Sequence, residues 1–343
     1  MQTQLLIGGE WSDGSGSERF DVENPANEEI IASVAAGTTQ DATRACAAAA
    51  DAQGAWAATA PRERGEILRR TWQLMIDHTD ELARLITLEH GKPLADARGE
   101  VAYAAEFFRW NSEEAVRIHG SMGRAPAGAN RIVVHHPPVG VVVIVTPWNF
   151  PAAMITRKLA PALAAGNAAV IKPPRETPLT ALRIGELLHE AGLPAGVVNI
   201  VPTLTSGAWF DAAVDHPATR MVSFTGSTEV GIVLLTRSAD RVLKTVMELG
   251  GNAPCSVFDD ADLDAAVQGA MVAKMRHSAE TCTAANRFFV HEAVADEFTR
   301  MFAAAMADVR IGNGLDDGVT CGPMINAKAV TSINELVTAA ADH

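Results

Sequence analysis

From Gly140 to Leu249 the chain alternates between short apolar runs and segments long enough to form a helix. The apolar runs are "VVVIV", "AAVIKP", "GVVNIV", "RMVSF" and "VLKTVMEL". Apolar strands separated by helices predict a parallel sheet that is covered by helices on both faces. In such sheets ligands bind at the carboxyl ends of the strands. We therefore expect a site in the loops after Val145, Ile171 and Phe224.

The first third of the chain predicts a cover of helices. Short strands in "QLLIGG" and "EIIASV" precede three predicted helices over 38–58, 61–92 and about 93–119. Thr38 would cap the first helix, Pro61 opens the second and Gly91 closes it. The segment "GSMGRAPAGANRIVVHHPPVG" predicts an exposed arm that meets another subunit. A second region begins at Asn252, with helices near 262–276 and 292–308.

Composition excludes several classes of protein. The chain has 343 residues, of which 48% are hydrophobic, so it can fill the cores of two domains. A net charge of −13 without a basic block argues against nucleic-acid binding. The absence of a membrane-length apolar run or signal pattern predicts no membrane partner and a cytoplasmic location. The 4 cysteines are far apart and none has zinc-ligand spacing with histidines, so we expect free thiols and no metal.

Two polar residues follow the predicted strands directly. Asn149 in "TPWNFP" would display its amide at a helix amino terminus, where it could meet a developing negative charge. Its alternative role is to cap that helix. Lys172 in "AVIKPPRETP" could reach a ribose hydroxyl or a phosphate, or could be a solvated lysine at a strand end.

The stretch "FTGSTEVG" contains a possible dinucleotide site. Gly226 and Gly231 bracket a turn into a helix, and Ser227 with the helix amino terminus could receive a pyrophosphate. The spacing is not Gly-x-Gly-x-x-Gly, so a plain turn is the alternative.

Glu248 and Cys282 are candidates for acid–base and nucleophilic chemistry. Glu248 lies between Met247 and Leu249, where partial desolvation would suit it to take a proton from water. The alternative is a glutamate that faces solvent. Cys282, in "RHSAETCTAANR", could be a nucleophile or an inert buried thiol.

The motifs "TPWNFP", "KP", "FTGSTEVG", "MELGG" and "ETCTAANR" occur in this order, and the chain resembles the NAD(P)-dependent aldehyde dehydrogenase superfamily. The runs "TLEHGKPLADARGE" and "VMELGGNAP" look most like its succinate-semialdehyde dehydrogenases. The resemblance implies an α/β fold with a Rossmann-type parallel sheet, a partial α/β catalytic domain and a protruding oligomerisation hairpin. It implies a dinucleotide-binding domain over 1–118 and 139–249, an arm over 119–138 and a catalytic domain over 250–343.

The resemblance also implies a mechanism. Cys282 would attack the aldehyde carbonyl, and the oxyanion would be held by the Asn149 side-chain amide and the Cys282 N–H. Glu248 would activate the water that hydrolyses the resulting thioester. An enzyme that releases the thioester to coenzyme A does not need this base. The presence of Glu248 therefore argues against an acylating dehydrogenase.

The family's cofactor contacts map onto seven positions of this chain. Arg175 stands where NAD-preferring members often carry a glutamate, which favours NADP over NAD as the cofactor. The other implied contacts are Trp148, Lys172, Gly226, Ser227, Gly231 and Leu249.

Two arginines bear on the substrate. By resemblance, Arg157 and Arg276 would grip the distal carboxylate of a short semialdehyde such as succinate semialdehyde. Another acidic aldehyde would satisfy the same pair, and either arginine could instead serve a structural ion pair.

The chain departs from the family pattern at the nucleophile loop and in length. Ala279 and Glu280 replace the usual glycine and glutamine. Family chains continue well beyond residue 343, so we expect either a fragment of a longer product or a shortened relative with impaired catalysis. The rival interpretation is a silent remnant that binds dinucleotide or a partner. The full-length chain would form a homo-oligomer, a dimer or a tetramer.

Overall fold

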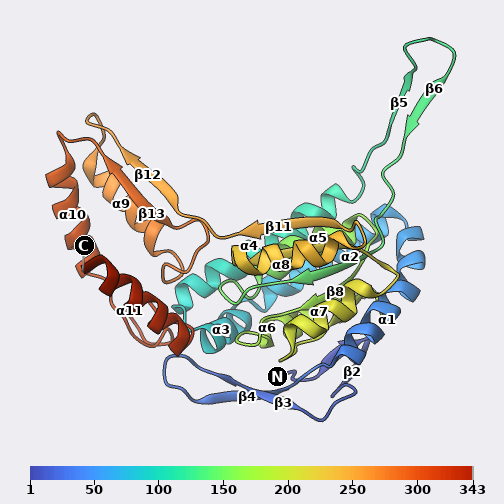
Figure 1. The fold of residues 1–343 in the computed structure, drawn as a ribbon, viewed down its shortest axis with the longest axis horizontal. Coiled ribbons are helices and arrows are strands. Elements are labelled where there is room, and N and C mark those ends of the chain that lie inside the picture. Colours follow the sequence, from blue (N-terminus) through green and yellow to red (C-terminus); the bar gives the residue numbers. More distant parts are fainter. Residues whose placement is uncertain (342–343) are drawn as a thin grey trace.

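A seven-stranded sheet forms the centre of the computed structural model, which describes residues 1–341 (Figure 1). The strand order is β11-β10-β7-β8-β9-β1-β2. The first five strands are parallel to one another, whereas β1 pairs antiparallel with β9 and β2. The bounds are β1 Leu5–Ile7, β2 Glu10–Ser12, β7 Val141–Val145, β8 Ala168–Lys172, β9 Val198–Ile200, β10 Thr219–Gly226 and β11 Lys244–Leu249. The predicted α/β fold with a parallel sheet is confirmed.

Both faces of the central sheet are covered. Along β7, Val142 and Ile144 belong to one apolar core, and Val141, Val143 and Val145 belong to another. Because successive side chains of a strand point to opposite faces, the sheet is buried on both sides. The strands are connected through α5 Ala153–Ala164, α6 Leu179–Glu190, α7 Ser206–Asp215 and α8 Thr228–Ala239.

The amino-terminal helices differ from the prediction at one point. The helix expected over 61–92 is two helices, α2 Pro61–Asp77 and α3 Thr79–His90, which are separated at His78. There the Thr79 hydroxyl donates to the Ile76 carbonyl at 2.7 Å, so a side chain competes with the helical backbone pattern. Thr38 does cap α1, Thr39–Ala58, and α4 spans Leu94–Glu114.

Three smaller units extend from this body. The exposed hairpin of β5 Ser121–Arg124 and β6 Arg131–Val134 protrudes from it, and β3 Arg19–Glu23 pairs with β4 Ile30–Ala35 (Figure 1). At the opposite end lies a parallel pair, β12 Ala253–Val257 and β13 Ala285–Val290. Its helices are α9 Leu263–Met275, α10 Ala295–Ala307 and α11 Ala327–Ala341. The division into domains stays a prediction.

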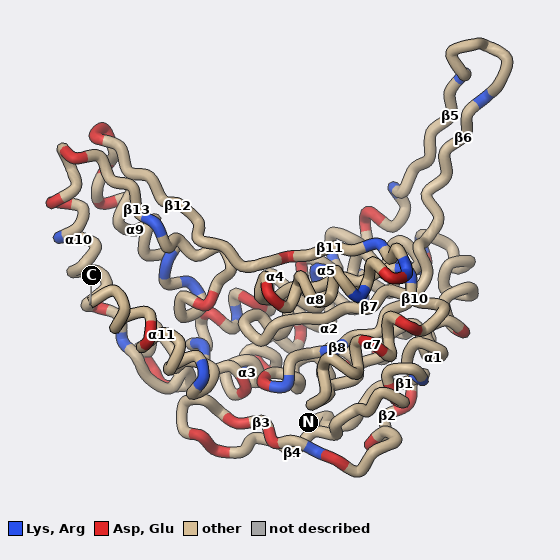
Figure 2. Tube along the Cα trace, viewed as in Figure 1, with Lys and Arg blue, Asp and Glu red and all other residues tan. Residues whose placement is uncertain are grey.

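Charge is dispersed over the molecule. Acidic and basic residues are scattered along the whole trace (Figure 2). Among residues 1–341 no helix is both long and apolar enough to cross a membrane. The same residues contain no group of three or more metal-ligating side chains that could hold an ion.

Candidate active site

The predicted site residues gather at one edge of the sheet. Asn149 follows β7, Lys172 ends β8, Gly226 ends β10 and Leu249 ends β11. These strands are mutually parallel, so their carboxyl ends share one edge. The strand order therefore brings together residues that are far apart in the sequence.

Cys282 lines a cavity of about 490 Å³ that also contains both predicted substrate arginines, Arg157 and Arg276. The thiol side chain is half-buried, as is Arg157, whereas Arg276 is exposed. Tyr103 and Phe150 add aromatic walls. A cavity with one thiol and two guanidinium groups suits a small acidic molecule that has a reactive second end.

The other cysteines are poorer nucleophiles or lie elsewhere. Cys46 is fully buried, and burial raises the pKa of its thiol to about 11, a rise that a hydrogen bond from Thr219 only partly offsets. Burial also raises the pKa of Cys321. Cys255 lies on β12 and is half-buried. Since the thiolate is the reactive form, Cys282 is the best candidate.

Asn149 contacts the loop that carries Cys282. Its Nδ2 donates to the Glu280 carbonyl at 2.7 Å, and its own carbonyl accepts from Lys92 Nζ at 2.7 Å. The N-cap residue of α5 is Ala152, and no side chain caps that helix. The capping alternative for Asn149 is therefore wrong.

Glu248 requires a correction. The expected partial desolvation is wrong, because the residue is exposed. β11 is an edge strand, and Glu248 lines a separate cavity of about 330 Å³. Arg157 lines both this cavity and that of Cys282. Gly251, three residues after Glu248, lies next to the Cys282 backbone, since a Cβ atom added to it would be 3.9 Å from the Cys282 carbonyl oxygen.

Lys172 is buried, so the solvated alternative for it is wrong. Its Nζ donates to the Pro173 carbonyl at 3.1 Å. Burial lowers the pKa of Lys172 to about 8, against the opposing effect of Glu176. An ammonium group has three donors, so Lys172 has donors to spare for a ligand. Trp148 is half-buried and Arg175 is exposed.

Packing explains the two glycines of the β10–α8 turn. A Cβ atom on Gly226 would collide with the Phe224 ring, and one on Gly231 would lie 2.6 Å from Leu249 Cδ2. Ser227 is exposed and caps α8, because its hydroxyl accepts from the Val230 N–H at 3.3 Å. The turn is thus fixed by its own contacts. The first residues of α8, Thr228 and Glu229, are exposed, so an anion could reach this helix amino terminus.

Several polar residues at this edge were not expected from the sequence. The hydroxyls of Thr146 and Thr225 are buried without a hydrogen-bond partner. Lys92 and Glu100 form a fully buried ion pair of 2.6 Å. The burial of Glu100 could have been predicted from the helical pattern, because Glu100 lies within a stripe of buried residues on α4. The stripe consists of Ala97, Val101, Ala104, Ala105 and Phe108.

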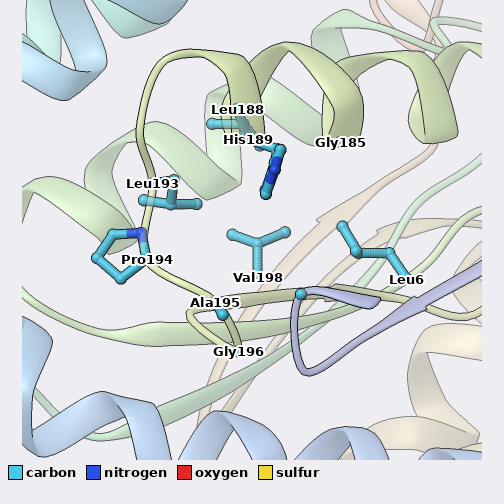
Figure 3. Close-up of a pocket in the computed structure, with 10 residues that line it drawn as sticks. Leu6, Gly185, Leu188, His189, Leu193, Pro194, Ala195, Gly196 and Val198 are labelled. Carbon is cyan, nitrogen blue, oxygen red and sulfur yellow. The ribbon is translucent and has the colours of Figure 1, made fainter. Parts of the chain in front are cut away.

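A third pocket lies away from this edge and is much smaller than the other two. Leu188 and His189 of α6 line it with Val198 of β9 and Leu6 of β1 (Figure 3). Its volume is about 20 Å³, and a space of this size holds about one water molecule. It is a packing gap and not a substrate site.

A model of the aldehyde dehydrogenase family matches residues 11–343. This chain belongs to the aldehyde dehydrogenase family. It is therefore an oxidoreductase of the NAD(P)-dependent aldehyde dehydrogenase type, as its motifs predict.

Individual relatives agree with this membership. The chain is 54% identical to a succinate-semialdehyde dehydrogenase of Paenarthrobacter nicotinovorans, covering 91% of this chain and 70% of the relative. It is 48% identical to a glutarate-semialdehyde dehydrogenase of Pseudomonas putida, covering 98% and 70%. The crystal structure of an E. coli NADP dependent enzyme superposes with a TM-score of 0.95 at 48% identity, covering 97% of this chain and 69% of that one.

Proposed function

We propose that this chain oxidises a short aldehyde with an acid group at its far end, succinate semialdehyde first, to the corresponding acid. The observation that carries the proposal is the shared cavity of Cys282, Arg157 and Arg276. Two guanidinium groups attract a carboxylate and orient the molecule, which leaves its other end for the thiol. The names of two relatives, which specify succinate and glutarate semialdehydes, support an acidic substrate and leave its chain length open.

Cys282 is the proposed nucleophile. Its thiolate adds to the aldehyde carbon, and the carbonyl oxygen takes up the negative charge. The Asn149 amide and the Cys282 N–H are the proposed donors to that oxygen. In support, Asn149 Nδ2 already contacts the same loop, two residues before the nucleophile.

NADP is the proposed cofactor, with NAD as the alternative. When bound, it accepts the hydride that leaves the substrate carbon. The residues fit such a group, because Lys172 has spare donors and the buried hydroxyls of Thr146 and Thr225 have no partner. Trp148, Gly226, Ser227, Gly231 and Leu249 would form the rest of the site. Arg175 would contact a 2′-phosphate. The similar E. coli enzyme is named as NADP dependent, which also supports NADP.

Glu248 is the proposed base for the second half-reaction. It would take a proton from the water that hydrolyses the Cys282 thioester and releases the acid. In support, the chain three residues after Glu248 lies next to Cys282, at Gly251. The exposure of Glu248, outside the thiol cavity, favours the second candidate function, a silent relative that binds dinucleotide or a partner.

A homo-oligomer built through the hairpin and a cytoplasmic location also stay predictions.

The arginine pair gives the test of substrate class. Arg157→Met and Arg276→Met remove the charge and keep a long side chain. We expect each to lower kcat/KM for succinate semialdehyde by about 10- to 100-fold, the worth of a charged hydrogen bond. Activity with butanal, which lacks the carboxylate, should change little. The measurement is the rate of absorbance increase from the reduced nicotinamide.

Arg62→Met is the matched control, because Arg62 is an exposed arginine of α2 remote from the cavity. It should leave kcat/KM for both substrates unchanged. If the two arginine variants lose equal factors of kcat/KM with succinate semialdehyde and with butanal, a carboxylate-binding role for these arginines is ruled out.

A further inference from the structure

A buried ion pair lies behind the cavity of Cys282. Lys92, between α3 and α4, and Glu100, on α4, both have side chains that are 0% exposed, and Lys92 Nζ lies 2.6 Å from Glu100 Oε2. Burying two charges costs several kcal/mol per ion, so the pair persists only with further hydrogen bonds. Those hydrogen bonds lead to the proposed catalytic groups.

The pair holds the segment that carries Asn149. Lys92 Nζ donates to the Asn149 carbonyl at 2.7 Å and lies 4.6 Å from the centre of the Phe150 ring. Glu100 Oε1 accepts from the N–H groups of Ala152 and Ala153, at 2.9 and 3.2 Å. The start of α5 is thus bound by both members of the pair.

The pair also reaches the loop of Cys282 through His277. Lys92 Nζ lies 3.3 Å from His277 Nδ1, and the His277 ring centre lies 4.3 Å from that of Phe150. The His277 N–H donates to Asp96 Oδ2 at 2.9 Å. Burial, aided by Lys92 and Arg276, lowers the pKa of His277 to about 3, so its neutral ring can accept from the ammonium.

His277 begins an unfavourable piece of backbone. His277, Ser278 and Ala279 have φ values of 51°, 57° and 65°. Each non-glycine residue in this left-handed region costs about 1 to 2 kcal/mol, so the surroundings must hold the turn. Besides Lys92 and Asp96, another segment contributes a contact, since the Ser278 hydroxyl accepts from the Gly322 N–H at 2.9 Å.

We propose that Lys92, with Glu100 as its counter-ion, is a positioning residue that holds Asn149 and the left-handed turn before Cys282 in one fixed arrangement. The proposal rests on the proposed function, because it assigns the oxyanion donor to Asn149 and the nucleophile to Cys282. A displacement of about 1 Å between such groups can cost about 100-fold in rate. The ion pair would therefore act on the chemical step and not on aldehyde binding.

The test is the double variant Lys92→Met/Glu100→Gln, which removes both charges and keeps the shapes. Since replacing a buried pair by neutral groups is often near neutral for stability, we expect it to melt within about 5 °C of the unmodified chain. The kcat for succinate semialdehyde should fall by about 10- to 100-fold, with KM within about threefold. Amides of 277–283 should exchange hydrogen about tenfold faster, while those of β7 and β8 stay unchanged.

Asp41→Asn is the matched control, because Asp41 is also a fully buried carboxylate that caps a helix, α1, far from the cavity. It should lower the melting temperature and leave kcat unchanged. If the double variant does not fold, Glu100→Gln alone serves, since its amide oxygen can still accept from Ala152, and kcat should again fall.

An unchanged kcat in a folded variant would overturn the proposal. If the unmodified chain itself oxidises no aldehyde, the proposed function fails, and hydrogen exchange then decides on the ion pair separately. Faster exchange confined to 277–283 supports its positioning role, and unchanged exchange there refutes it.

Discussion

Glu280 is an acidic residue at a position where its charge is strongly disfavoured. Its side chain is 5% exposed and lies 3.2 Å from His90 Nε2, at a distance typical of an ion pair but without the geometry of a hydrogen bond. Burial raises the pKa of Glu280 to about 8, although Lys92 opposes the rise. Burial also lowers the pKa of His90 well below its usual range. Near pH 7 both side chains are therefore neutral.

This burial predicts a loss of stability with rising pH. Between its ordinary pKa of 4.5 and its folded value of about 8, Glu280 binds a proton in the folded chain and not in the unfolded one. The free energy of unfolding should then fall by about 1 kcal/mol per pH unit over this interval from Glu280 alone. Glu280→Gln should remove that contribution, as measured by urea unfolding at pH 5, 6, 7 and 8.

Glu292→Gln provides the comparison, because Glu292 is exposed. It should follow the pH dependence of the unmodified chain. A Glu280→Gln profile that is parallel to the unmodified one would contradict a neutral, buried Glu280.

At the scale of elements, the sheet was predictable and the turn before Cys282 was not. Fully apolar runs such as β7 identify strands that are buried on both faces, whatever surrounds them. The turn at 277–279 has no glycine, and its left-handed backbone depends on Asp96, Lys92 and Gly322, which lie on other segments. Contacts with distant segments cannot be predicted from the local sequence.

Ala279 tests whether that turn is strained. Ala279→Gly should raise the free energy of unfolding by about 0.5 kcal/mol, because relief of the left-handed backbone exceeds the added freedom of the unfolded chain. Ala273→Gly, at an exposed position within α9, should lower it by about 1 kcal/mol. Denaturant unfolding measures both. If Ala279→Gly lowers the free energy of unfolding as much as Ala273→Gly does, the turn is not strained.

The candidate residues show the same limit of prediction. The parallel strands were enough to expect Asn149 and Lys172 near one edge. The role of Cys282 was expected from the family resemblance, because this residue follows no strand of that sheet. The exposure of Glu248 was not predictable from its apolar neighbours, because it depends on β11 lying at the edge of the sheet.

At the scale of the whole molecule, the cavity exists only where two units meet. Arg157 comes from the body around the central sheet, whereas Arg276 and Cys282 come from the loop between α9 and β13. The units are joined near the cavity, since the Leu94 N–H donates to the Gly314 carbonyl at 2.9 Å. The proposed reaction at Cys282 therefore requires that this junction hold the loop against the body.

The most direct test is to mix the 343-residue chain with succinate semialdehyde and NADP and to follow the absorbance of reduced nicotinamide. We predict steady formation of reduced cofactor by the unmodified chain and none by Cys282→Ala. No formation by the unmodified chain, or equal formation by Cys282→Ala, would contradict oxidation of an acidic aldehyde at Cys282.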